Sequence, residues 1–126
     1  MKIASYKELE AYKKGYNLVL LIYQITKNFP KEELYGITSQ IRRAAISVPC
    51  NISEGYMRGS REYVQFLKIA LGSSAELETL LSLSKDLGYC SETDFSKLYN
   101  LNLEIKKLLS TYISKITERC TLNAVR

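Results

Sequence analysis

The chain of 126 residues contains no histidine and no tryptophan, and it has only two prolines and six glycines. Because histidine is the commonest general base and metal ligand, its absence excludes serine triads, Cys–His dyads and histidine-containing zinc sites. Hydrophobic residues make up 46% of the chain and charged residues 25%, which is a globular balance rather than a disordered or fibrous one. A packed core is therefore expected.

Cysteine is scarce as well. Cys50, Cys90 and Cys120 are odd in number and far apart, which favours neither a disulfide framework nor a metal knuckle. We expect reduced thiols in a cytoplasmic protein. The longest apolar run, residues 18–23, is far shorter than the ~20 residues that cross a bilayer, and the first residues run straight into charged ones. The sequence therefore predicts neither export nor a membrane span.

The size and charge of the chain fit one basic domain. A length of 126 residues falls within the usual range for a single domain, and a core of that size needs no disulfide or metal. The 18 Lys and Arg residues exceed the 13 Asp and Glu residues, giving a net charge of +5 and a calculated pI near 9.1. This excess favours contact with polyanions.

Capping signals and apolar residues spaced three and four apart predict four helices, and no strand-like alternation competes with them. The helices span about residues 6–28, 34–57, 61–87 and 92–118. Short connections make sequential helices antiparallel neighbours. The expected fold class is all-α, an antiparallel up-down-up-down four-helix bundle that forms a single domain over residues 1–126.

Several residues mark the helix boundaries. A serine at a helix start accepts a hydrogen bond from a backbone N–H, and a glycine adopts the left-handed conformation that ends a helix. Pro49 lies inside the second helix, where its missing N–H predicts a kink. The small residues 72–75 predict a close helix approach. The boundary signals are Ser5 with Glu8, Phe29 with Pro30, Ser60, Gly88, and Ser91 with Asp94.

A line of polar side chains follows the second helix. Advancing each residue by about 100° places its members three or four residues apart on one side. Apolar residues flank the line, with Ile46 and Cys50 beyond one edge, so we expect it to be half buried. We call this line the polar row; it comprises Gln40, Arg43, Ser47, Asn51, Glu54 and Arg58.

Two interpretations of the polar row remain open. It is either a hydrogen-bonding seam, solvated or between subunits, in which Glu54 and Arg58 pair one turn apart, or a recognition surface. Recognition is favoured by amides that both donate and accept and by an arginine fork that matches phosphate. The two interpretations can coexist.

Positive charge continues past the row at Arg58, Arg61 and Lys68. Tyr56 and Tyr63 are interleaved with these residues, in positions where they could stack on unpaired bases. The alternative is that these tyrosines belong to the core and expose only a polar tip. The lysine pairs 13–14 and 106–107 are interpreted as solvated faces.

No pattern typical of an enzyme remains. The acidic residues at 32–33, 76, 78, 92 and 94 resemble helix-start or exposed-face acids, and the Glu-x-x-His motif of di-iron bundles is absent. Without histidine, activation of Cys50 would depend on Arg43 or a helix end, so we expect Cys50 to be buried and inert. We therefore expect no catalytic residue, no metal site and no cofactor.

Two segments carry a family resemblance: residues 40–55, QIRRAAISVPCNISEG, and residues 58–73, RGSREYVQFLKIALGS. They resemble the four-helix-bundle family of 23S rRNA intervening-sequence proteins, and the similarity extends over roughly residues 5–116. The residues that match the family motif are Gln40, Arg42, Arg43, Asn51, Glu54, Gly55 and Arg58.

The resemblance implies a bacterial antiparallel four-helix bundle that assembles into a ring, typically a pentamer. A related branch is similar to the accessory protein of diversity-generating retroelements, a basic pentamer that associates with a reverse transcriptase and nucleic acid. The resemblance thus implies RNA or an RNA–protein complex as a partner.

The sequence therefore predicts a non-catalytic homo-oligomer that binds RNA or a ribonucleoprotein through a basic surface. Ile46 and Leu101, apolar residues off the inner helix faces, also favour self-association. The alternative is a scaffold that recruits a protein such as a polymerase without binding nucleic acid directly. The candidate binding residues are Gln40, Arg42, Arg43, Asn51, Glu54, Arg58, Arg61 and Lys68.

Overall fold

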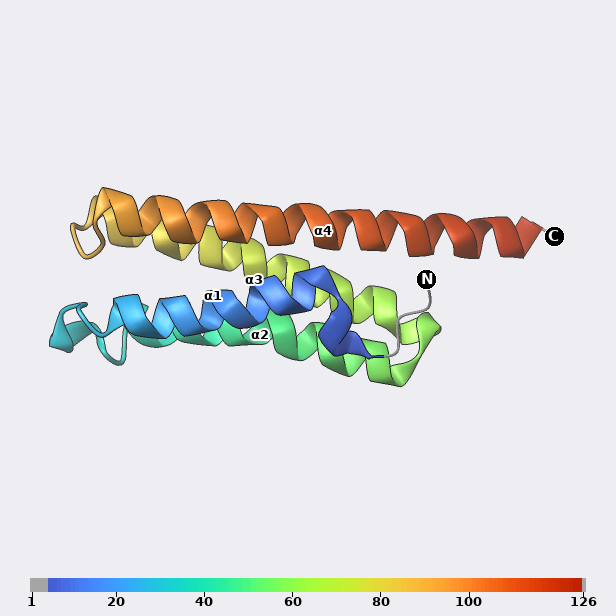
Figure 1. Cartoon of the computed structure of the whole chain (residues 1–126), viewed down its shortest axis with the longest axis horizontal. Helices are drawn as coiled ribbons and strands as arrows, with labels where there is room; N and C mark the ends of the chain where they lie inside the picture. The colour runs from blue at the N-terminus through green and yellow to red at the C-terminus, as the bar shows by residue number, and fades with distance from the viewer. Residues whose placement is uncertain (1–4, 126) are drawn as a thin grey trace.

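Apolar side chains recurring at helical spacing fold the chain into four long helices that lie side by side (Figure 1). The computed structural model describes the backbone of residues 5–125 and the side chains of residues 5–119. Its helices are η1, a 3-10 turn at Tyr6–Glu8; α1, Glu10–Thr26; η2, a second 3-10 turn at Lys31–Glu33; α2, Ile37–Arg58; α3, Ser60–Asp86; and α4, Glu92–Val125.

The packing of the helices confirms the predicted all-α four-helix bundle. The α1 and α3 helices each contact both α2 and α4. The core is formed by inward-facing aliphatic residues such as Leu18, Ile41, Leu67 and Ile105, each no more than 1% exposed. The C-terminal end of α4 continues past the turn that joins α2 to α3 (Figure 1). Because α4 runs from Glu92 to Val125, the predicted end of this helix at residue 118 was too early.

The start of the first helix differs from the prediction. Ser5, which with Glu8 was predicted to mark the start of the first long helix, instead caps the 3-10 turn η1 by accepting a hydrogen bond from Lys7 N at 3.2 Å. The chain then becomes extended at Leu9, and α1 begins at Glu10. Burial of Leu9, which is 7% exposed, explains the break, because the extended residue carries its side chain into the core.

The connections follow local chemistry with one exception. Gly59, at φ +104°, precedes α3, so Ser60 lies inside the helix and is not its cap as predicted. Gly88 has φ +81° after α3, as predicted for a terminating glycine. Asp94 N donates to Ser91 Oγ at 3.1 Å, which confirms the predicted cap of α4.

Close approach between α2 and α3 occurs within the predicted segment 72–75, where Ser73 Oγ lies 2.7 Å from Ser47 Oγ, and also at Gly55, which was not predicted. A Cβ atom on Gly55 would lie 2.5 Å from Cβ of Phe66, so only glycine allows this contact. Gly72 has nothing within 4 Å of the same position, and it does not bring the helices together. The α2 helix continues through the buried Pro49, and the kink there stays a prediction.

Candidate functional site

The middle of the polar row joins α2 to α3. Ser47 Oγ and Ser73 Oγ lie 2.7 Å apart and share a hydrogen bond. Asn51 Nδ2 donates to Ser47 O at 2.7 Å and to Ser47 Oγ at 2.9 Å. Both Ser47 and Asn51 are partly buried. This part of the row is a hydrogen-bonding seam within one subunit, whereas the first interpretation placed the seam in solvent or between subunits.

The end of the row near Gly59 is an ion-pair network. Arg58 donates to Glu54 Oε2 at 2.8 Å and to Glu62 Oε2 at 3.2 Å. Its guanidinium also lies 5.0 Å from the centre of the Phe66 ring. About half of the Arg58 side chain and about half of the Glu54 side chain is exposed, which agrees with the predicted half burial at this end of the row. With two carboxylates on one guanidinium, Arg58 contributes no free positive charge here.

The other end of the row opens into a polar groove of about 490 Å³ between α2 and α3. Arg43 and Glu76 line this groove and are both exposed. Within the described residues, neither side chain forms a salt bridge. We call this site the polar groove; it is lined by Gln40, Arg43, Ala44, Ser47, Ser73 and Glu76.

Arg42, adjacent in sequence to Arg43, points to the other side of α2. Its Nε donates to Thr26 Oγ1 at 3.0 Å, and its guanidinium lies 4.6 Å from the centre of the Tyr23 ring. Both partners belong to α1. The structure therefore separates Arg42 from the other predicted binding residues, because one residue advances the helix by about 100°.

Arg61 and Lys68 lie on the exposed side of α3. In the part of the chain that is described, neither forms a salt bridge with an acidic residue. They are seven residues apart, or about two helical turns, so they share one side of α3. Arg43, Arg61 and Lys68 are thus the exposed cations of the predicted set without a carboxylate partner.

For Tyr56 and Tyr63, the structure favours the second of the two interpretations, because both pack against the core. The Tyr56 and Tyr63 rings meet edge to face at 5.9 Å, and Tyr56 also contacts the Tyr6 ring at 6.2 Å. Burial, followed by the neighbouring Tyr112 and Tyr56, raises the pKa of Tyr63 to about 12. These rings therefore hold η1, α2 and α3 together and are not a surface for bases.

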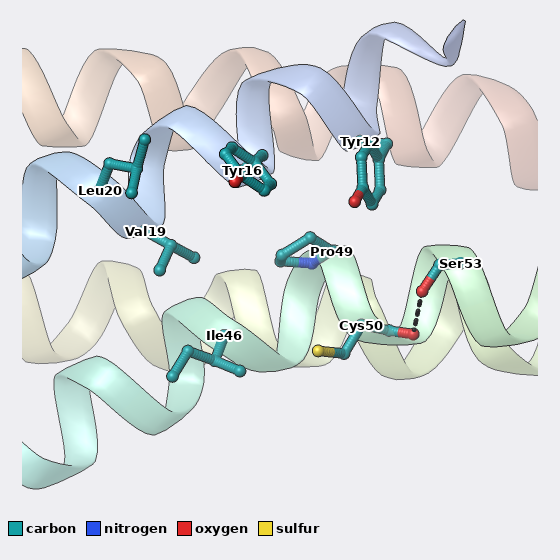
Figure 2. Close-up of a pocket in the computed structure, with 8 residues that line it drawn as sticks. All are labelled: Tyr12, Tyr16, Val19, Leu20, Ile46, Pro49, Cys50 and Ser53. Atoms are coloured by element: carbon teal, nitrogen blue, oxygen red, sulfur yellow. Dashed lines mark hydrogen bonds between the residues drawn. The ribbon is translucent and has the colours of Figure 1, made fainter. Parts of the chain in front are cut away.

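A second groove, apolar and about 320 Å³ in volume, lies between α1 and α2 (Figure 2). Figure 2 shows Tyr16 and Leu20 of α1 on one side and Ile46 and Cys50 of α2 on the other. Tyr16 is 52% exposed and Leu20 is 57% exposed. We call this surface the apolar groove.

Cys50 is a free, exposed thiol, so the prediction that it is buried was wrong. The Cys50 side chain lines the apolar groove and is not part of the core (Figure 2). Cys90 is free and buried, and burial is the main cause that raises the pKa of its thiol. The side chain of Cys120 lies outside the described residues.

Sequence reasoning missed Glu76 and Ser73 as members of the polar groove, because both belong to α3 while the row was derived from α2 alone. It also placed Lys106 on a solvated face, but Lys106 Nζ pairs with Glu78 Oε1 at 2.9 Å across α3 and α4. A helical-wheel comparison of residues 60–86 would have placed residues 73 and 76 on one face, three residues apart.

The described part of the chain contains no group of three or more Cys, Asp and Glu residues placed to hold a metal ion. Among the same residues, no helix is both long and apolar enough to cross a membrane.

The fold defines a small helical-bundle protein with a polar groove between α2 and α3 and an apolar groove between α1 and α2. A sequence model described as 23S rRNA-intervening sequence protein matches residues 7–111, and the chain belongs to this family. A similar solved structure is that of a protein of unknown function from the S23 ribosomal protein family of Bacteroides thetaiotaomicron. It is 25% identical with a TM-score of 0.76, and the match covers 82% of this chain and 95% of that one. No curated protein matches the chain.

Proposed function

We propose that this chain is a non-catalytic, cytoplasmic binding protein whose partner is RNA or a ribonucleoprotein. The polar groove and the neighbouring outer side of α3 form the binding surface. The observation that carries the proposal is that Arg43 lines the groove without an acidic partner among the described residues. An exposed arginine without a carboxylate partner is free to donate to a phosphate or a base edge.

The charge distribution supports the same surface. Arg61 and Lys68 are exposed on α3, which also supplies Ser73 to the groove. The net charge of +5 favours approach of a polyanion from solution. The family description, 23S rRNA-intervening sequence protein, associates the family with ribosomal RNA and supports RNA as the partner.

Binding to a structured RNA across a salt series tests this proposal. Phosphate contacts give a log–log slope of about −0.7 to −0.9 for each phosphate neutralised. We expect binding at low salt that weakens steeply as salt rises. Undetectable binding at low salt would contradict the proposal.

The second part of the proposal is that the chain forms a homo-oligomer, with a pentameric ring as the form that the family resemblance implies. The apolar groove supports self-association, because Tyr16, Leu20 and Ile46 expose 52%, 57% and 37% of their surface beside one another. Contiguous exposed apolar surface of this kind marks interaction sites. Leu101, the other residue expected outside, instead packs partly buried against the core.

Light scattering on the wild type and on Leu20→Arg tests the homo-oligomer. We expect a multimer from the wild type and a smaller species from the variant, because a charge in an apolar interface is costly to desolvate. Leu83→Arg is the control, since Leu83 is 47% exposed on α3, away from the residues that line the apolar groove. A monomeric wild type at micromolar concentration would reject the idea.

The alternative function, a scaffold for a protein partner such as a polymerase, is favoured by the connection between α1 and α2. Leu34 there is 46% exposed and Tyr35 is 94% exposed. Co-purification that survives nuclease treatment and is lost in Tyr35→Ser would favour the scaffold. Loss of all partners on nuclease treatment would favour RNA.

A further inference from the structure

The polar groove holds two opposite charges that do not pair. Arg43 comes from α2 and Glu76 from α3, and both line the same open space. Among the described residues, no carboxylate lies within ion-pair distance of Arg43 and no Lys or Arg within that distance of Glu76. Ser47 and Ser73, whose hydroxyls share a hydrogen bond of 2.7 Å, line the same groove. The groove therefore presents a cation, an anion and two hydroxyls to one ligand.

This combination does not suit a phosphate alone. A phosphate that approached Arg43 would also approach the carboxylate of Glu76, and the two negative charges repel. A ligand that fits must accept hydrogen bonds from Arg43 and donate them to Glu76 through separate atoms. The groove volume of about 490 Å³ lies within the range usual for small-molecule sites.

Guanine is the RNA base that best meets both demands. Its O6 and N7 atoms accept a bidentate arginine, while N1–H and the N2 amino group donate side by side to a carboxylate. The other bases do not offer two adjacent donors together with this pair of acceptors. Unpaired bases in RNA are read along these Watson–Crick and Hoogsteen edges.

We propose that the polar groove recognises an unpaired guanine in RNA, with Arg43 donating to O6 and N7 and Glu76 accepting from N1–H and N2–H. Gln40, which lines the same groove, can donate to or accept from the base or the sugar. This inference rests on the proposed RNA-binding function. The exposed cations Arg61 and Lys68 then contact the phosphates, and the groove identifies the base.

The test uses short unstructured RNAs of uridine that carry one central guanosine, adenosine or inosine, with binding followed by fluorescence anisotropy at one salt concentration. Inosine lacks only the N2 amino group, so it removes a single donor to Glu76. We expect the guanosine strand to bind roughly ten-fold more tightly than the adenosine and inosine strands.

Glu76→Gln separates base recognition from charge. Removing a negative charge should leave affinity for the all-uridine strand unchanged or higher, while the preference for guanosine over inosine is lost. Glu118→Gln, which changes an exposed glutamate on α4, should keep that preference. If Glu76→Gln keeps the preference, or changes the mass of the protein in light scattering, the carboxylate does not read guanine.

The possible results distinguish this inference from the proposed function. Equal binding of all strands by the wild type would overturn guanine recognition and leave RNA binding in place. No binding to any strand, nor to structured RNA at low salt, would remove the proposed function and the guanine site together.

Discussion

Ser74 of α3 and Asn102 of α4 are joined by two hydrogen bonds inside the bundle. Ser74 Oγ donates to Asn102 Oδ1 at 2.8 Å, and Asn102 Nδ2 donates to Ser74 O at 2.9 Å. Neither residue is more than 1% exposed. Because a shift of either helix would leave these buried groups without partners, the pair fixes the register of α3 against α4.

Asn102→Ala should lower the free energy of unfolding by about 3 kcal/mol, since it leaves the Ser74 hydroxyl unsatisfied and opens a cavity. Ser74→Ala removes only one of the two bonds and should cost less. Urea unfolding of both single variants and the double variant, at one protein concentration, measures the coupling. Additive effects would show that the two side chains do not act together.

Two helical glycines should respond to alanine with opposite signs. At Gly15 an added Cβ would meet Val48 at 3.4 Å and Pro49 at 3.5 Å, which is ordinary contact. Gly15→Ala should therefore raise the free energy of unfolding by about 0.5–1 kcal/mol through the lower entropy of the unfolded chain.

Gly55→Ala should instead destabilise by about 1–3 kcal/mol, because its Cβ would lie 2.5 Å from Cβ of Phe66. Gly72→Ala is the control, because nothing lies within 4 Å of its added Cβ. It should resemble Gly15→Ala in thermal melting. A stabilised Gly55→Ala would show that α2 and α3 can separate there without cost.

Stability should fall at alkaline pH because of Tyr63. Its folded-state pKa is raised to about 12 from an ordinary value of 10.0, so the unfolded chain loses the phenol proton first. The stabilising effect is complete below pH 10 and is lost as pH rises from about 10 to 12. Tyr63→Phe should lose less stability over this range in urea unfolding. An unchanged slope would assign the loss to other groups.

Removal of charge from the proposed binding surface should weaken RNA binding more than removal of equal charge elsewhere. Arg61→Ala with Lys68→Ala should reduce the magnitude of the log–log salt slope by about 1.4–1.8, for two lost phosphate contacts. Lys97→Ala with Lys107→Ala, two exposed positions on α4, is the matched control. Equal weakening by both pairs would mean that overall charge alone controls binding.

Arg58 and Lys106 are unsuitable for this comparison. Arg58 bridges Glu54 and Glu62, and Lys106 pairs with Glu78, so substitution of either would also release a carboxylate. Changes in binding could then come from the freed negative charge.

Local chemistry was sufficient to predict the helices and several of their ends. The Ser91 cap and the positive φ of Gly88 each depend on residues within a few positions of one another. Spacing of apolar residues likewise placed the core faces correctly, because the helical period depends on the backbone alone. The start of α1 was not predicted, since burial of Leu9 is a tertiary effect.

The sequence by itself therefore determined four helices, their inner faces and the line of polar residues on α2. Only the tertiary structure decided which of those residues remain available. The rotation and register of α3 against α2 place Glu76 of α3 in the same groove as Arg43 of α2. The rotation and the register of α3 depend on packing of the whole core, including the contact at Gly55, so they cannot be predicted from the sequence of one helix.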